Sequence, residues 1–127
     1  MWALYQPNPS GKSVGDCTVR ALTKALDKSW YEVYFDLALQ GAMMGDMPSA
    51  NAVTTAYMRE NGFRRRTIPE TCPYCYTIED FCKDHPSGTF VIGTGSHLTT
   101  VIDGTLFDSW NSLAETPVYY FEKMEEE

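Results

Sequence analysis

The chain has 127 residues, of which 43% are apolar, and a net charge of −7. This length suffices for one hydrophobic core and is too short for two ordinary domains, so we expect a single domain over residues 1–127. The acidic balance excludes general nucleic-acid binding, which relies on neutralising phosphates with Lys and Arg. The one basic cluster, Arg64-Arg65-Arg66, is interpreted as the solvated face of a strand.

The N-terminal arm, residues 1–13, is rich in Pro, Asn, Ser and Gly and is predicted to be extended. Its first seven residues carry neither a basic segment nor an apolar run, so we expect no secretory signal. No stretch of the sequence approaches the roughly 18 apolar residues of a membrane span, and we expect no membrane partner. The expected compartment is therefore the cytoplasm, where cysteines are free thiols, catalytic groups or metal ligands more often than disulfides.

Helix signals dominate the first half of the chain. Asp16 is a suitable N-cap, and Ser29 with Glu32 has the spacing of a capping box that opens a second helix. A third helix is expected between Pro48 and Gly62. The predicted helices cover residues 17–26, 30 to about 41 or 45, and 49 or 50 to 61.

The second half of the chain has the short alternating patterns of strands. Strands are predicted at 63–68, 89–92 and 118–121, with a short helix at 77–82 between the first two. Helices come first and a mainly antiparallel sheet follows, which is the order of an α+β domain with N-terminal helices packed on the sheet.

A β-hairpin is predicted over residues 95–110, turning at Asp103-Gly104, a pair suited to the positive φ angles of a two-residue type I′ turn. In that register Ile102 pairs with Thr105. His97 and Asp108 then share one side of the sheet as diagonal neighbours. A carboxylate within reach of an imidazole can fix its tautomer and stabilise its cationic form.

Cys17 supplies the nucleophile that this pair lacks. It follows a predicted N-cap, at the positive end of a helix, where the dipole and the unpaired N–H groups favour a thiolate. Cysteine-nucleophile enzymes need such a thiolate, a base within reach and a group that orients the base. Cys17, His97 and Asp108 meet these needs in this order, with Asn111 as the other candidate orienting group.

These residues carry a resemblance to a known family. The segments 15–22, 95–99 and 107–110 together resemble the papain-like cysteine peptidase fold in a minimal form. They also look like small papain-like proteins carried by bacterial phages and prophages. The resemblance implies a cysteine hydrolase, a peptidase or amidase, that needs no cofactor and acts on a peptide or another amide. It implies Cys17 as nucleophile, His97 as general base and Asp108 as orienting acid.

The resemblance also implies an oxyanion-hole donor, since papain-like enzymes place a Gln about six residues before the nucleophile. This chain has Gly11 there, so Asn8 or Gln6 from the N-terminal arm is the candidate replacement, with the Cys17 backbone N–H as the second donor. The departure leaves room for a second hypothesis: a non-catalytic papain-like module that binds or inhibits a protein partner. Its acidic surface would suit a basic partner.

Residues 72–85 hold two competing motifs. Cys72-Pro73-Tyr74-Cys75 matches the redox tetrapeptide of glutaredoxins, although the chain after it predicts antiparallel hairpins and not the parallel strands of that fold. The second motif is a possible zinc site of the Cys₃His type, with two, six and two residues between its ligands. Its ligands would be Cys72, Cys75, Cys82 and His85. The remaining interpretation is free thiols around a short helix.

Overall fold

A six-stranded sheet separates two layers of helices in the computed structural model, which describes residues 1–125. The strands are β1 (Trp2–Leu4), β2 (Phe63–Thr67), β3 (Thr89–Gly93), β4 (Leu98–Ile102), β5 (Thr105–Asp108) and β6 (Tyr119–Lys123). The helices are α1 (Cys17–Leu26), α2 (Trp30–Met44), α3 (Asn51–Glu60) and α4 (Ile78–Asp84). The expected α+β class is confirmed at this level.

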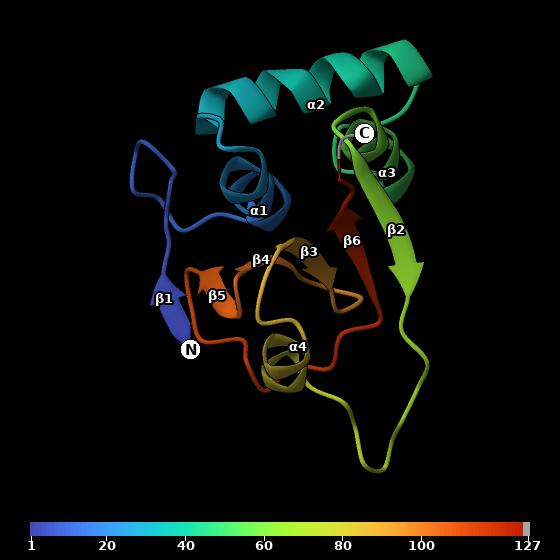
Figure 1. Ribbon diagram of the computed structural model, residues 1–127. Helices are drawn as coiled ribbons and strands as arrows, with labels where there is room; N and C mark the ends of the chain where they lie inside the picture. Colours follow the sequence, from blue (N-terminus) through green and yellow to red (C-terminus); the bar gives the residue numbers. More distant parts are fainter. Residues whose placement is uncertain (126–127) are drawn as a thin grey trace.

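The strands lie in the order β1-β5-β4-β3-β6-β2 (Figure 1). All neighbouring pairs are antiparallel except β1 and β5, which run parallel. The arm that the sequence predicted to be extended thus begins with an edge strand. It pairs with β5, the second strand of the predicted hairpin, and Leu4 is the register partner of Asp108.

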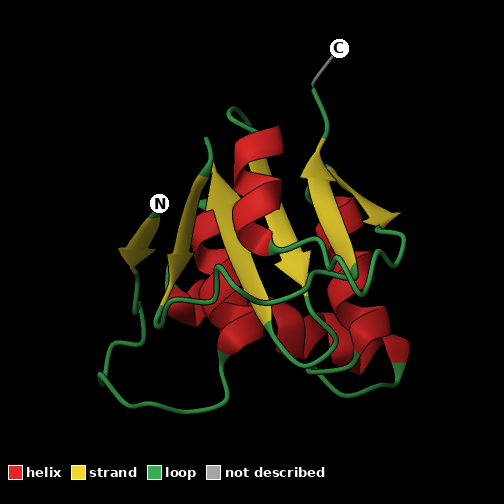
Figure 2. Ribbon diagram, turned by 90° about the horizontal axis from the view of Figure 1, so that it is seen from below, coloured by secondary structure: helices red, strands yellow, loops and turns green. Residues whose placement is uncertain are grey.

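The helices cover the two faces of the sheet unequally. Figure 2 shows α4 alone on one face, with the other helices behind the sheet. On that crowded face α2 lies outermost, over α1 and α3 (Figure 1). Its outer side exposes Tyr31, Phe35 and Leu39 at four-residue spacing, so α2 buries only one side.

The core accordingly divides into two clusters. The larger one joins α1, α2 and α3 to the sheet and contains Leu22, Val33 and Phe121; the smaller one lies under α4 and contains Phe81 and Ile92. Fully burying a side chain of this size stabilises the fold by about 1.5–3 kcal/mol. Both clusters reach the middle strands, and α1 packs directly on β4 of the β4–β5 hairpin.

Local sequence rules placed most helix ends correctly. Ser29 and Glu32 form the expected capping box of α2, and Gly45 ends that helix in the left-handed conformation. Asp16 immediately precedes α1, but its carboxylate makes no cap hydrogen bond because it binds side chains elsewhere. Among the described residues, every helix is too short or too polar to cross a membrane.

Candidate active site

The β4–β5 hairpin forms as the sequence predicts. Asp103 and Gly104 both have positive φ angles, 50° and 77°, and Ile102 pairs with Thr105. The register brings the residue before β4, His97, to the residue that ends β5, Asp108. The imidazole Nε2 donates to the carboxylate Oδ2 at 2.6 Å. Because Nε2 is hydrogen-bonded to Asp108, Nδ1 is the ring nitrogen that remains available for proton transfer.

Asp108 is almost completely buried, with 1% of its side chain exposed, and each of its carboxylate oxygens accepts two hydrogen bonds. Oδ2 accepts from His97 and from the Ser112 hydroxyl at 2.7 Å. Oδ1 accepts from the Ser109 backbone N–H at 2.7 Å and from Arg20 Nη2 at 3.3 Å. This set of donors holds the carboxylate in one orientation and therefore also holds the imidazole.

Cys17 is the first residue of α1 and is half-buried. It lines a pocket of about 200 Å³ together with His97 and the loop residues Gly95 and Ser96. The first turn of a helix leaves its backbone N–H groups without intrahelical partners, so this pocket is supplied with donors beside the sulfur. The structure therefore brings Cys17, His97 and Asp108 together in one site.

The pKa shifts of these groups match a thiolate–imidazolium pair. The pKa of the Cys17 thiol is lowered, mainly by the hydrogen bond from His97; burial opposes this, and the Leu98 backbone and the charges of His97 and Arg20 support it. Burial disfavours charge on His97, yet the hydrogen bonds with Asp108 and Cys17 outweigh it and raise its pKa to about 9. Both groups are consequently charged between the lowered thiol pKa and about pH 9.

The pKa of Asp108 is lowered even though burial acts to raise it. The hydrogen bonds from His97 and Ser112 and the charge of His97 outweigh the burial. The carboxylate therefore stays ionised at neutral pH. It supplies the fixed negative charge that stabilises the imidazolium.

Aromatic side chains flank the site. The Trp110 ring lies 5.0 Å from the His97 ring and is 43% exposed, while Trp2 Nε1 donates to the Asp108 carbonyl at 3.2 Å. On the other side Tyr119 lines the Cys17 pocket and its ring covers Gly93. A Cβ at Gly93 would lie 2.1 Å from that ring, so glycine is required for Tyr119 to form this wall.

The two oxyanion candidates of the N-terminal arm do not line this pocket. Asn8 Oδ1 accepts from Ser10, and its Nδ2 donates to the Lys12 carbonyl at 3.4 Å. Gln6 Oε1 accepts from the Asn8 backbone N–H at 3.3 Å. Both amide side chains therefore form hydrogen bonds within the N-terminal arm itself. The side chains of α3 that do line the pocket are Asn51 and Thr54.

Sequence reasoning missed the buried charges beneath the site. Arg20, only 7% exposed at its side chain, lies between Asp16 and Asp108, with Nη1 2.7 Å from Asp16 Oδ1. Asp16 also accepts from Trp30 Nε1 at 3.0 Å. The four-residue spacing of Asp16 and Arg20 was a visible signal for their pairing. Nothing local signalled the contact with Asp108, which lies 88 residues further on.

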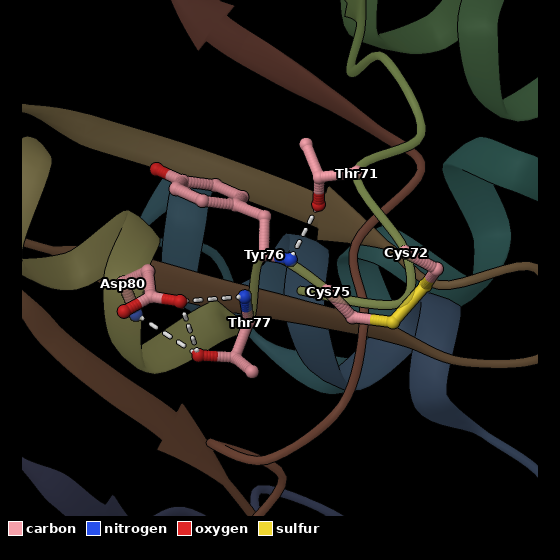
Figure 3. The surroundings of a disulfide bond; sticks show 6 residues. All are labelled: Thr71, Cys72, Cys75, Tyr76, Thr77 and Asp80. Carbon is pink, nitrogen blue, oxygen red and sulfur yellow. Dashed lines mark hydrogen bonds between the residues drawn. A yellow bond between two sulfur atoms is a disulfide. The ribbon is translucent and has the colours of Figure 1, made fainter.

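The zinc site that the sequence left open as an alternative does not form. Cys72 and Cys75 form a disulfide, which consumes two of the four candidate ligands (Figure 3). Cys82 points into the apolar cluster under α4, and His85 Nδ1 bonds to the Phe81 carbonyl at 3.0 Å. Within residues 1–125, no group of three or more His, Cys, Asp or Glu side chains is placed to hold a metal ion. The expectation that the cysteines are mostly free also fails for this pair.

The Cys-Pro-Tyr-Cys tetrapeptide lies in the loop between β2 and α4. In Figure 3 the disulfide stands apart from the Thr77–Asp80 capping box that starts α4. Tyr74 is 91% exposed, and the strands around the loop are antiparallel. The loop therefore lacks the parallel-strand surroundings that the redox interpretation required.

Replacing Ser112 by Ala tests how far Asp108 depends on its neighbours. Ser112 is completely buried, and its hydroxyl donates to the oxygen that binds His97. We expect a loss of about 1–2 kcal/mol in the free energy of unfolding, measured in urea, because a buried charge-assisted hydrogen bond disappears. Ser109→Ala is the matched control, since Ser109 reaches Asp108 through its backbone N–H. Equal losses in both variants would contradict the assignment.

Comparison of the chain with known proteins found no match among protein-family models, curated proteins or solved structures.

Proposed function

We propose that the chain is a cysteine-dependent hydrolase with a papain-like fold, a peptidase or amidase that acts through Cys17, His97 and Asp108. One observation carries the proposal. A buried carboxylate binds the His97 imidazole at 2.6 Å, in a pocket shared with a thiol of lowered pKa. A structural cysteine in a core has the opposite property, and Cys82, whose pKa burial raises, is the example within this chain.

In the proposed reaction the Cys17 thiolate attacks the carbonyl carbon of the substrate and forms a tetrahedral intermediate. His97 Nδ1 then donates its proton to the leaving amine, the carbon–nitrogen bond breaks, and a thioester remains on Cys17. Water adds to the thioester while Nδ1 takes one of its protons. Collapse of the second intermediate releases the carboxylic acid and restores the thiolate and the imidazolium.

The negative oxygen of both intermediates needs donors, and the first turn of α1 is the proposed source. The backbone N–H of Cys17 has no intrahelical partner, because Arg20 is the first residue whose N–H closes the helical pattern, onto the Asp16 carbonyl. The helix dipole adds a partial positive charge at this point. Removing one such donor typically lowers kcat by about 10²–10³-fold.

The decisive experiment measures turnover of a panel of peptidyl and simple aryl amides by the wild-type chain and by Cys17→Ala. We expect turnover in the wild type that the variant loses by at least about 10³-fold. Acid quenching during turnover should also leave an acyl group on Cys17, visible by mass spectrometry. Activity that survives in Cys17→Ala would refute the proposal.

A second outcome would favour the other hypothesis. A Cys17 that is alkylated readily but turns over none of the amides points to a non-catalytic module for a protein partner. The position of Gln6 and Asn8 away from the pocket is the observation that favours it, because the usual side-chain oxyanion donor is then missing.

A further inference from the structure

A second pocket lies beside the Cys17 pocket, between the start of α1, the middle of α2 and the loop that leads into α3. Its volume is about 200 Å³, and Thr18 lines both pockets. Asp16 and Thr18, the neighbours of Cys17 in the chain, both belong to the wall of this α1–α2 pocket. Since consecutive Cα atoms are about 3.8 Å apart, that wall begins one residue from the nucleophile.

The α1–α2 pocket has a mainly apolar lining. Residues three and four apart are neighbours on the surface of a helix, so three of the lining residues share one side of α2. The others come from α1 and from the loop before α3. The apolar and aromatic lining residues are Val19, Tyr34, Leu37, Ala38 and Pro48. An occupant of the pocket is therefore surrounded mainly by apolar side chains.

The carboxylate in the wall does not offer a free negative charge to a ligand. Asp16 Oδ1 accepts from Arg20 Nη1 at 2.7 Å, and Oδ2 accepts from Trp30 Nε1 at 3.0 Å. Asp16 is also only 7% exposed. The polar side chains of Thr18 and Ser49, which complete the wall, are uncharged. The pocket therefore favours an uncharged apolar group over a cation or an anion.

The size of the α1–α2 pocket suits one side chain. A cavity of about 150 Å³ holds benzene, so about 200 Å³ accommodates the side chain of Leu or Phe. Gly15 lies at the mouth, is exposed, and would meet nothing within 4 Å if it carried a Cβ. This side of the mouth is thus open to an entering side chain.

We propose that the α1–α2 pocket binds an apolar side chain of the substrate, of the size of Leu or Phe, beside the carbonyl that reacts with Cys17. The inference rests on the proposed hydrolase function for the reaction itself, whereas the position of the pocket beside the thiol does not depend on it. The substrate class narrows from amides in general to amides with an apolar residue next to the reacting carbonyl.

Alkylation of Cys17 tests the pocket without requiring turnover. The probes are N-phenethyl-iodoacetamide and N-hydroxyethyl-iodoacetamide, which differ only in the group beside the reactive carbon. In both, the thiolate attacks the methylene carbon and iodide leaves. The second-order rate, measured by peptide mass spectrometry, should be at least about tenfold higher for the phenethyl probe. Equal rates for the two probes would overturn the inference.

Two variants fill the pocket from different walls. Ala38→Phe adds a ring from α2, and Ser49→Leu adds a side chain from the exposed loop before α3. Each should lower the ratio of the two rates from about tenfold to near one. The ratio is compared within one variant, so a change in the reactivity of the thiol itself cancels. A cooperative urea transition verifies that each variant is folded. A ratio that stays at its wild-type value in both variants would overturn the inference.

Ala42→Phe is the matched control, since Ala42 lies one turn further along α2, is exposed and is not part of the pocket lining. It should leave both alkylation rates at their wild-type values. If Ala42→Phe lowered the ratio as much as Ala38→Phe does, added bulk on α2 would explain both results, and the pocket assignment would be refuted.

Cleavage separates this inference from the proposed function. With the wild-type chain, Leu or Phe beside the cleaved bond should raise kcat/KM by at least about tenfold over Gly, and Ala38→Phe should remove the preference. Hydrolysis together with equal alkylation by the two probes overturns the pocket and leaves the hydrolase standing. A tenfold preference in alkylation that Ala38→Phe removes, without turnover of any amide, supports the pocket and refutes the hydrolase.

Discussion

Iodoacetamide is expected to alkylate Cys17 at pH 6 at least about tenfold faster than an ordinary thiol. An unperturbed thiol with a pKa of about 8.5 is less than about 1% ionised at that pH. Cys17 has a lowered pKa because His97 hydrogen-bonds to it, so far more of it is thiolate. The alkylation rate of Cys17, measured by peptide mass spectrometry, should therefore stay high well below pH 8.

The chain contains its own comparison thiol. Cys82 is buried and its pKa is raised, so it should react slowly in the folded protein, and Cys82→Ser should leave the profile of Cys17 unchanged. His97→Ala removes the hydrogen bond. The alkylation rate of Cys17 should then increase with pH only in the range in which an ordinary thiol ionises. An unchanged profile in His97→Ala would show that the lowered pKa has another source.

Asp108→Asn is expected to destabilise the fold by about 3 kcal/mol, because it leaves His97 without its buried counter-charge and Arg20 with Asp16 alone. The same change should shift the fast alkylation of Cys17 to higher pH. Without the carboxylate His97 binds its proton less tightly, so it stabilises the Cys17 thiolate less. Unfolding in urea measures the first effect and the alkylation profile measures the second. Glu79→Gln, which removes an exposed pair with Lys83, should cost less than about 1 kcal/mol.

The cost of Asp108→Asn should depend on pH. The folded pKa of His97, about 9, exceeds its ordinary value of about 6.5. The stability that the charged His97 contributes is thus complete below about pH 6.5 and disappears as the pH rises through 9. The difference between wild type and Asp108→Asn should be larger at pH 6 than at pH 9.5. An equal difference at both pH values would show that His97 is not the partner that stabilises Asp108.

The local parts of the site could be predicted because each follows from a short-range rule. Asp103 and Gly104 adopt the positive φ angles of a two-residue turn, and this turn sets the register of the strands on both sides. Once the register is known, the diagonal proximity of His97 and Asp108 follows from the geometry of paired strands. The start of α1 at Cys17 follows likewise from the helix pattern after Asp16.

The zinc alternative rested on local spacing alone, and the four candidate ligands do not come together. Cys82 lies on the side of α4 that packs against Phe90 and Ile92, so its sulfur points into the core. Cys72 and Cys75 are close enough to bond to each other, with 4.1 Å between their Cα atoms. Spacing in the sequence identifies residues that could bind one metal ion, but the packing of each element decides the direction in which its side chains point.

The sequence by itself determined the helices, the strands other than β1, the hairpin register and the pairing of His97 with Asp108, because these depend mainly on short-range patterns. The edge strand β1 was expected only as an extended arm, since its partner β5 lies about 100 residues further on. Only the tertiary structure placed Cys17 beside that pair, since packing of α1 on the sheet joins segments about 80 residues apart. It also decided that Arg20 contacts Asp108 from α1. Such contacts depend on how whole elements pack, and no short-range pattern encodes them.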